Sequence, residues 1–218
     1  STHCISSAAS DVYKRQIIVQ LICLRKDVKM SEVLSLKNSE ELLEKTRQKC
    51  AECQKCPLGQ TRTKSVFSSG AINNKLMLIG EAPGYWEDQK GEPFVGKAGQ
   101  LLDKIFASVG LSRQNDVYIC NTLKCRPPEN RNPLPEEKAA CREYLDIQVG
   151  ALKPRIILLC GNIAVQSFME GAKGITKVRG QWFDGPYGSK MMPIFHPSYL
   201  LRNESLSLIH ISEPTRLG

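Results

Sequence analysis

The sequence lacks long apolar segments, internal repeats and low-complexity stretches. The apolar segment near its start, residues 17–24, is short, is interrupted by Gln20 and is followed by charges without a small-residue cleavage site. A membrane span needs about 20 apolar residues and a signal peptide needs a cleavage site, so neither is indicated. We therefore expect a cytosolic protein without a membrane partner.

Histidine is also scarce, and none of the three histidines begins an HxE sequence. A zinc deaminase of nucleobases needs HxE followed by PCxxC, so that class of enzyme is excluded. His196 still stands out, because it follows the apolar segment 191–195. A lone histidine is often a structural hydrogen-bonding residue, but an expected place at the same sheet edge as Glu81 and Asn121 favours a functional role.

Cysteine, by contrast, is abundant, with nine residues. The odd number argues against full disulfide pairing, and metal or redox chemistry is more typical of such a chain. Cys53 and Cys56 form a CxxC pair, and Cys125 and Cys141 form a second, wider pair. The wide spacing suits the scattered ligands of an iron-sulfur cluster, but spacing alone leaves a cluster, a zinc ion and no metal open.

A further cysteine complicates this choice. Cys50 extends the first pair to CxxCxxC, which is like the first part of a bacterial ferredoxin sequence. The fourth cysteine of that sequence is absent, because Gln60 stands in its place. Whether Cys50 can replace one of the four candidate ligands is left open by the sequence.

The length of 218 residues and the hydrophobic content of 41% are typical of one globular domain. We expect this domain over residues 30–204, with Met30 as the authentic start. Residues 1–29 and 205–218 resemble translated adapter sequence and are expected to be non-native tails, so that the authentic carboxyl end is expected to be truncated. The net charge of +8 permits nucleic-acid binding without requiring it.

Short apolar segments that alternate with helical patterns predict the fold. The four segments expected to form strands are residues 76–79, 117–121, 155–160 and 191–195. Repeated alternation of strand and helix is typical of a parallel sheet between helices. We therefore predict an α/β protein, a three-layer α/β/α fold with a central four-stranded, mostly parallel sheet. A helix that begins at the capping residue Ser39 is expected to lead to the first cysteines.

The segment 80–99, GEAPGYWEDQKGEPFVGKAG, follows the first predicted strand. It combines several carboxylates with the aromatic residues Trp86 and Phe94, and its glycines allow close approach of a ligand. Ligands of open α/β sheets lie beyond the carboxyl ends of the strands. We interpret this segment as an active-site loop; a surface Ω-loop with solvated charges is the alternative.

Five motifs in order resemble one known family over about residues 50–202. They are the CxxCPL and Cx15C cysteine pairs, GEAPG with the downstream ED, GEPFVGKAGQLL, NTLKCRPPxNRxP and HPSYLL. Together they resemble the family 4 uracil-DNA glycosylases, the iron-sulfur branch of that superfamily. The sequence departs from the family pattern at Tyr85 and Trp86, where more polar or acidic residues would be expected.

The resemblance implies a DNA repair enzyme that hydrolyses the N-glycosidic bond of deoxyuridine and leaves an abasic site for base excision repair. It also implies a 4Fe-4S cluster on Cys53, Cys56, Cys125 and Cys141. No carboxylate pair with separate nucleophile and acid roles is evident, which favours direct attack by water. The expected partner is DNA that contains uracil, single- or double-stranded, and the chain is expected to act as a monomer.

The resemblance also implies roles for individual residues. Glu81 and His196 are the expected catalytic residues, with Glu81 at the water and sugar side and His196 at uracil O2. Phe94 would stack on uracil and Asn121 would read its edge. The uracil-binding residues expected in this way are Gly80, Ala82, Glu87, Phe94, Asn121 and His196.

Basic and apolar residues near these positions are the expected contacts to DNA. Cations beside Cys125 would meet phosphates, and Leu200 or Leu201 would wedge into the stack that the flipped base has left. The alternative is that these leucines belong to the core. The full set of expected DNA-binding residues is Lys124, Arg126, Arg131, Ser198, Leu200 and Arg202.

One reading from a different class of protein stays open on the sequence. The chain could be an iron-sulfur or zinc protein with an electron-transfer or structural role. The polar motifs at the strand ends would then line only a small-ligand pocket.

Overall fold

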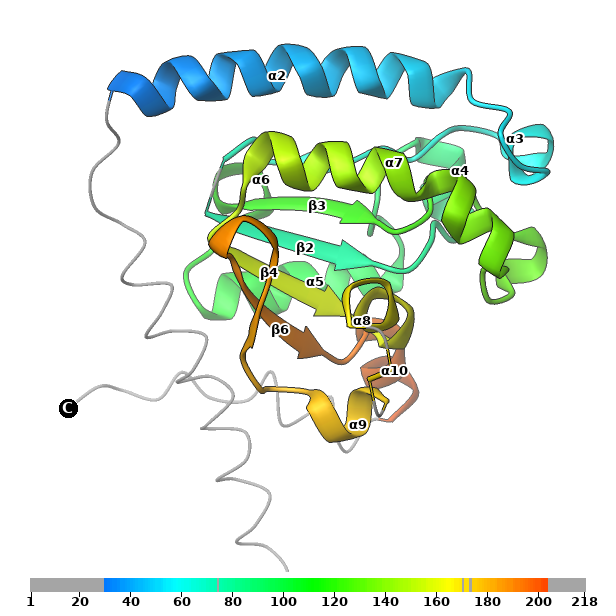
Figure 1. The fold of residues 1–218 in the computed structure, drawn as a ribbon. Coiled ribbons are helices and arrows are strands. Elements are labelled where there is room, and N and C mark those ends of the chain that lie inside the picture. The colour runs from blue at the N-terminus through cyan, green and yellow to red at the C-terminus, as the bar shows by residue number, and fades with distance from the viewer. Residues whose placement is uncertain (1–29, 74, 170, 173, 204–218) are drawn as a thin grey trace, which may run out of the picture.

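The computed structural model of the protein describes residues 30–73, 75–169, 171–172 and 174–203 (Figure 1). The predicted tails, residues 1–29 and 205–218, lie outside this part of the chain. Within it, six strands form one sheet in the order β1-β3-β2-β4-β6-β5. The strands are β1 (Ser69–Gly70), β2 (Leu76–Gly80), β3 (Val117–Asn121), β4 (Ile156–Cys160), β5 (Phe183–Asp184) and β6 (Lys190–Ile194).

The four predicted strands are the four central ones, and neighbouring strands among them are parallel. The sheet nevertheless has two more strands than predicted, because β1 and β5 pair antiparallel at its two edges. Each edge strand is two residues long. Such short strands have no alternation of side chains from which a sequence pattern could be recognised.

Helices occupy both faces of the sheet and several connections. The described helices are α2 (Met30–Ala51), α3 (Leu58–Thr61), α4 (Tyr85–Lys90), α5 (Lys97–Ser108), α6 (Arg113–Asp116), α7 (Pro135–Leu152), α8 (Asn162–Phe168), α9 (Ile175–Val178) and α10 (Pro197–Arg202), with 3-10 turns η2 (Pro128–Asn130) and η3 (Pro186–Gly188). The start of α7 follows its sequence signal. Pro135 needs no N–H partner at the first position, and the Glu137 carboxylate accepts the Leu134 N–H at 2.8 Å.

The first helix starts earlier than predicted. Ser39 was expected to cap its beginning, but α2 already begins at Met30. Inside the helix, the Ser39 hydroxyl donates a hydrogen bond to the main-chain oxygen of Ala151 on α7 at 2.7 Å. The polar side chain therefore joins two helices, although its sequence context suggested a cap.

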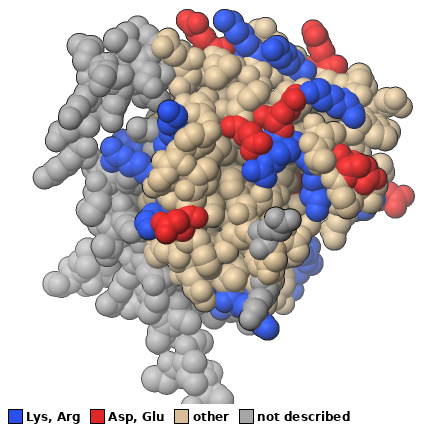
Figure 2. Space-filling model, viewed as in Figure 1, with Lys and Arg blue, Asp and Glu red and all other residues tan. Residues whose placement is uncertain are grey.

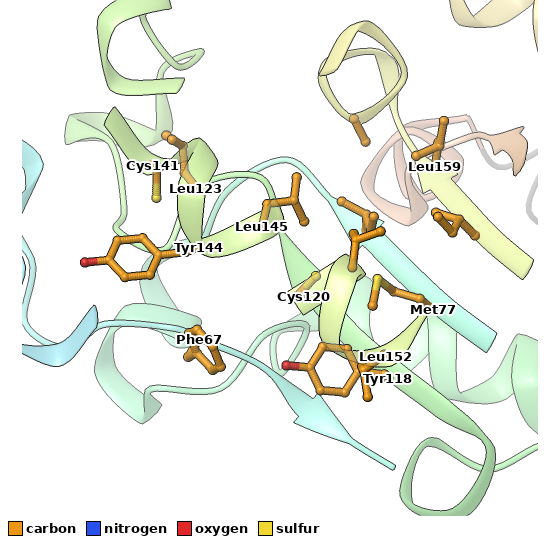
Figure 3. Packing of buried hydrophobic residues seen from close by; sticks show 14 of the residues in the cluster. Phe67, Met77, Tyr118, Cys120, Leu123, Cys141, Tyr144, Leu145, Leu152 and Leu159 are labelled. Carbon is orange, nitrogen blue, oxygen red and sulfur yellow. The ribbon is translucent and has the colours of Figure 1, made fainter. Parts of the chain in front are cut away.

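The three-layer prediction is confirmed by the two cores on either side of the sheet. Met77 and Ile79 of β2 pack in the core with α2, α7 and α8, whereas Leu76 and Leu78 pack in the core with α5. Figure 1 shows α7 and α5 on opposite faces, with α2 along α7. Figure 3 shows the first core, which extends from Leu159 to Cys141. Burial of each fully buried aliphatic side chain stabilises the folded state by about 1.5–3 kcal/mol, so these two cores hold the sheet in place.

The parallel strands bring their polar ends to one edge. Gly80 at the end of β2 pairs with Asn121 at the end of β3, and Cys160 of β4 pairs with Ile194 of β6. Gly161 and His196 follow those last two strands closely in the sequence. In the described part of the chain, no helix is both long and apolar enough to span a membrane.

Candidate active site

A cavity of about 550 Å³ opens at this edge of the sheet. Its walls come from the segments that follow β2, β3, β4 and β6, as expected for a ligand site of an α/β sheet. Most of the residues predicted for catalysis and uracil binding meet here. The predicted residues that line it are Glu81, Ala82, Glu87, Phe94, Asn121, Arg131, His196, Ser198 and Arg202.

Phe94 is held in an uncommon backbone conformation, with φ at 55°. Two Arg113 N–H groups donate to the main-chain oxygens of Pro93 at 2.8 Å and Phe94 at 2.7 Å and so fix this turn. Gly80 does not line the cavity, but a Cβ there would lie 2.7 Å from the Phe94 ring, and a Cβ on Gly99 would overlap the Phe94 carbonyl. The glycines thus make room for the aromatic ring that reaches the cavity.

His196 precedes α10 and serves two purposes. Its Nδ1 accepts the backbone N–H of Ser198 at 3.2 Å and lies 2.8 Å from the Ser198 hydroxyl, so it caps the helix. Because Nδ1 accepts, the proton of the neutral ring is on Nε2. Burial, assisted by Arg202, lowers the pKa of His196 to about 4, so the ring is neutral at physiological pH. The ring stacks on Phe94 with centroids 5.4 Å apart.

Asn121 ends β3 and is almost fully buried. Its side-chain oxygen is buried without a hydrogen-bond partner. A Cβ on Gly80 would lie 2.4 Å from this oxygen, so the glycine also leaves space for the amide. Leaving a buried acceptor unpaired costs about 1–3 kcal/mol. An amide kept in this state at a cavity wall is suited to a ligand that donates a hydrogen bond.

Two carboxylates line the cavity but differ in their surroundings. Burial raises the pKa of Glu81, while the nearby Lys138 acts in the opposite direction. Glu87 instead accepts the backbone N–H groups of Val95 and Gly96, both at 2.9 Å. Glu87 therefore holds the loop in place, whereas Glu81 has the environment of a carboxylate that acts on a ligand.

The four predicted cysteine ligands line a second, small cavity of about 10 Å³. Cys53 and Cys56 follow α2, Cys125 follows β3, and Cys141 lies on α7, where Figure 3 shows it near Leu123 and Tyr144. Cys50 lines the same cavity as these four thiols. Within the described residues, no group of three or more His, Cys, Asp or Glu side chains is arranged to hold a single metal ion. Ligands of a cluster bind separate irons and stand farther apart than those of one ion.

Donors also face these sulfur atoms. The Arg62 guanidinium donates to Cys125 Sγ at 3.0 Å, and the Lys124 backbone N–H donates to Cys141 Sγ at 3.3 Å. Burial raises the pKa of the Cys141 thiol to about 12 and that of Cys50 to about 11. A metal centre would therefore have to displace protons from buried thiols, and the donors would stabilise the resulting thiolates.

Comparison with known proteins decides the family. A model described as the uracil DNA glycosylase superfamily matches residues 67–214. The type-4 uracil-DNA glycosylase of Thermotoga maritima is 46% identical, over 79% of this chain and 90% of that protein. The type-4 enzyme of Archaeoglobus fulgidus is 40% identical, over 76% and 86%, and that of Pyrobaculum aerophilum is 40% identical, over 75% and 87%. The chain belongs to family 4 of the uracil-DNA glycosylases.

Two expected DNA contacts of this family 4 member are corrected by burial. Lys124 has no exposed surface, and its amine donates to the main-chain oxygen of Asn121 and to Gln148 Oε1, each at 2.6 Å. A buried amine cannot reach a phosphate. Leu200 is also buried and belongs to the core, whereas Leu201 next to it is exposed. Leu201 is therefore the remaining candidate for a wedge.

The other predicted cations of this uracil-DNA glycosylase lie near the cavity. Arg131 and Arg202 line it, and Arg131 also forms an ion pair with Glu137 at 2.6 Å. Arg126 lies outside the lining and donates to Asn130 Oδ1 at 2.8 Å. On the face shown in Figure 2, basic and acidic side chains are interspersed. Contacts to nucleic acid on this face would thus depend on single cations and not on a broad basic surface.

Sequence reasoning missed two asparagines of the glycosylase cavity. Asn162 begins α8, lines the cavity and has a buried side-chain oxygen without a partner. Asn130 lines the cavity from η2 and has φ at 55°. Asn162 could have been found, because Gly161 and Asn162 follow β4 at the same edge as Asn121. The placement of Asn130 depends on a loop conformation that the Pro-rich sequence does not specify.

Proposed function

We propose that this chain hydrolyses the N-glycosidic bond between uracil and deoxyribose in DNA and leaves an abasic site, the first step of base excision repair. Membership of family 4 supports this reaction, and one structural observation carries it. The buried, unpaired oxygen of Asn121 lies in the same cavity as the rings of Phe94 and His196. Aromatic faces and a hydrogen-bonding amide are what a flipped base requires.

Recognition of uracil follows from the amide of Asn121. Uracil offers a donor at N3–H and an acceptor at O4, which complement the oxygen and the amino group of the side chain. Cytosine presents the reverse pattern, an acceptor at N3 and a donor at N4. A good bidentate contact discriminates by about 1–3 kcal/mol, and a closed pocket with unpaired groups by more. Asn121 therefore selects uracil against cytosine.

His196 stabilises the leaving base. Cleavage leaves negative charge on uracil, and a donor that is held in place before the reaction stabilises this charge. The ring is neutral, with Nδ1 occupied by Ser198, so the Nε2–H is the group available to uracil O2. The stack on Phe94 and the hydrogen bonds to Ser198 fix the direction of this donor.

Glu81 acts on the opposite side of the scissile bond. The sugar develops positive charge during cleavage, and a carboxylate that is partly removed from water stabilises such charge strongly. It can also orient the attacking water. Glu87 is committed to two backbone N–H groups. A covalent intermediate would need a carboxylate free to attack as well as an acid, so the arrangement favours direct attack by water.

Access to the cavity requires that the nucleotide leaves the base stack, because a target atom inside a duplex cannot be reached. Apolar side chains next to a cation can fill the vacated space. Leu201 and Arg202, at the end of α10, have this combination, and Arg202 lines the cavity. We assign the wedge to Leu201, and the neighbouring phosphates to Arg202, Arg131 and Ser198.

Cys53, Cys56, Cys125 and Cys141 would hold a 4Fe-4S cluster in the second cavity. The residues fit this group, because the four thiols line one small cavity and two of them accept hydrogen bonds from Arg62 and the Lys124 backbone. When bound, the cluster would brace the segments that carry its ligands. The protein is expected to be purified coloured and with iron. A colourless protein that holds stoichiometric zinc and stays active after iron chelation would contradict this assignment.

The alternative function is a purely structural or electron-transfer role of the cysteine centre. It leaves the buried unpaired oxygens of Asn121 and Asn162 without a purpose. The cytosolic location and the monomeric state stay predictions, as does the single domain over residues 30–204.

The deciding experiment uses an oligonucleotide with one uracil, incubated with the iron-loaded protein and then treated with alkali. The expected result is strand cleavage at the uracil and no cleavage of matched oligonucleotides with thymine or cytosine at that position. Intact uracil strands after incubation with folded, iron-loaded protein would overturn the proposal. Cleavage without alkali would indicate a nuclease instead.

A further inference from the structure

Two large aromatic side chains are exposed beside the cavity. Tyr85 and Trp86, the first residues of α4, have 49% and 59% of their surfaces exposed. Their rings meet edge to face, with centroids 5.2 Å apart and planes at 81°. Such side chains normally contribute to stability by burial, so an exposed pair is informative about binding.

The backbone of this pair is fixed to the wall of the cavity. Gly84 and Glu87, on either side of the pair, both line the cavity. Glu87 accepts the N–H groups of Val95 and Gly96, which ties the start of α4 to the start of α5. Trp86 Cδ1 lies 3.6 Å from the place of a Cβ on Gly96. Trp86 therefore lies at the rim of the cavity.

A cation completes the exposed surface. The Arg126 guanidinium lies 5.2 Å from the centre of the Tyr85 ring. Its Nε also donates to Asn130, which lines the cavity, so the guanidinium is held from two sides. An aromatic face with a nearby fixed cation is the combination that binds unpaired nucleobases and their phosphates.

We propose that Tyr85, Trp86 and Arg126 form a stacking platform for an unpaired base of the strand that carries the uracil. The proposal rests on the proposed function, because the cavity defines where the uracil lies. The neighbouring nucleotide of the same strand passes the rim, where the Trp86 ring is exposed and Arg126 lies over the Tyr85 ring as a cation. Two half-exposed rings are far smaller than the roughly 800 Å² per partner of a stable protein interface, which favours a nucleobase as occupant.

The platform gives the enzyme a preference for unpaired DNA. In a duplex the neighbouring base stacks on its own neighbours. A contact with Trp86 would only compensate for the free energy of stacking that the base loses when it leaves the duplex. In a single strand this cost is small, so the contact adds to affinity. Removal of the platform should therefore weaken excision from single strands more than excision from duplexes.

Tryptophan fluorescence tests the platform directly. The chain has two tryptophans, so Trp182→Phe leaves Trp86 as the only reporter. Titration with a uracil-free single-stranded oligonucleotide should quench the emission of Trp86. An oligonucleotide of equal length and charge that has abasic sites in place of bases should quench it little. Equal quenching by both oligonucleotides would overturn the proposal, because it would indicate binding through phosphates alone.

Alanine variants give the matched comparison. Trp86→Ala and Tyr85→Ala should each weaken single-strand binding about five- to tenfold. Tyr187→Ala is the control, because Tyr187 is 63% exposed in η3, before the strand that ends at the cavity, and should bind as the parent does. Equal affinities of Trp86→Ala and Tyr187→Ala would overturn the platform.

Excision by the parent separates the two proposals. Quenching by uracil-free single strands without excision of uracil would support the platform and overturn the glycosylase. Excision without quenching would support the glycosylase and overturn the platform.

Discussion

The two cavities of this protein differ in what their buried polar groups contact. In the cavity at the sheet edge, buried side-chain oxygens of Asn121 and Asn162 have no partner. In the cysteine cavity, Arg62 and the Lys124 backbone already donate to sulfur. The first cavity has a volume of about 550 Å³, and the second is a small pocket of about 10 Å³ lined by thiols. The cavity at the sheet edge thus holds two of the unpaired buried oxygens of the described residues, whereas sulfur atoms in the cysteine cavity already accept hydrogen bonds.

The largest expected effect is a loss of uracil excision on substitution of Glu81, without any change at the cysteine cavity. Glu81→Gln removes the charge that faces the developing sugar cation, so the single-turnover rate should fall ten- to thousandfold. Iron content and thermal stability should stay as in the parent, because Glu81 lies away from the cysteines. Glu92→Gln, on the same loop but exposed, is the matched control and should keep the parent rate. An unchanged rate in Glu81→Gln would remove this residue from the mechanism.

The next prediction concerns the unpaired oxygen itself. Asn121→Asp keeps the shape of the side chain and loses the amino group that would meet uracil O4. Excision of uracil should slow by about 5- to 150-fold, equivalent to 1–3 kcal/mol, and slow excision of cytosine should become detectable. The measurement is the ratio of uracil to cytosine excision at matched folding. If this ratio stayed constant, Asn121 would only end the strand.

Substitution of Lys124 should have a smaller effect on stability that extends to both cavities. Lys124→Met leaves the Asn121 main-chain oxygen and Gln148 Oε1 without their donor, which should cost about 1–3 kcal/mol of the free energy of unfolding. Uracil excision and iron retention should both decline. Lys104→Met, on the exposed side of α5, is the control. A loss confined to one cavity would show that Lys124 does not connect them.

The smallest effect is on pH dependence. Burial lowers the pKa of His196 to about 4, below the ordinary value of 6.5. Between these values the unfolded chain binds a proton that the folded chain does not, so this histidine should make the protein less stable as pH falls from 6.5 towards 4. His196→Gln should lose this part of the pH dependence in thermal denaturation. An identical dependence in the variant would assign the effect to other groups.

The elements that could be predicted share one physical property. The four parallel strands are apolar along their length because both faces are buried, and each ends in a polar motif at one edge. That rule alone brings Glu81, Asn121 and His196 together. The cysteine spacing likewise identified thiols that line one cavity.

The sequence-based predictions that were wrong concern the direction in which side chains point. Lys124 and Arg126 flank Cys125 and look equivalent in sequence, yet the first is buried and the second reaches Tyr85. Leu200 and Leu201 differ in the same way, because adjacent positions of a helix face different sides. Residue type gives the chemistry of a group, but only packing decides whether solvent or DNA can reach it.

Lys124 contacts residues of both the cavity at the sheet edge and the cysteine centre. Its amine donates to the main-chain oxygen of Asn121, and its backbone N–H donates to Cys141 Sγ. A disturbance of the cysteine centre is therefore expected to shift the main chain at Asn121, the residue proposed to recognise uracil. An enzyme that cuts bases from a genome is dangerous when it loses selectivity but keeps its activity. Because Lys124 contacts both places, we expect that loss of the cysteine centre would lower uracil excision together with base selectivity, and not selectivity alone.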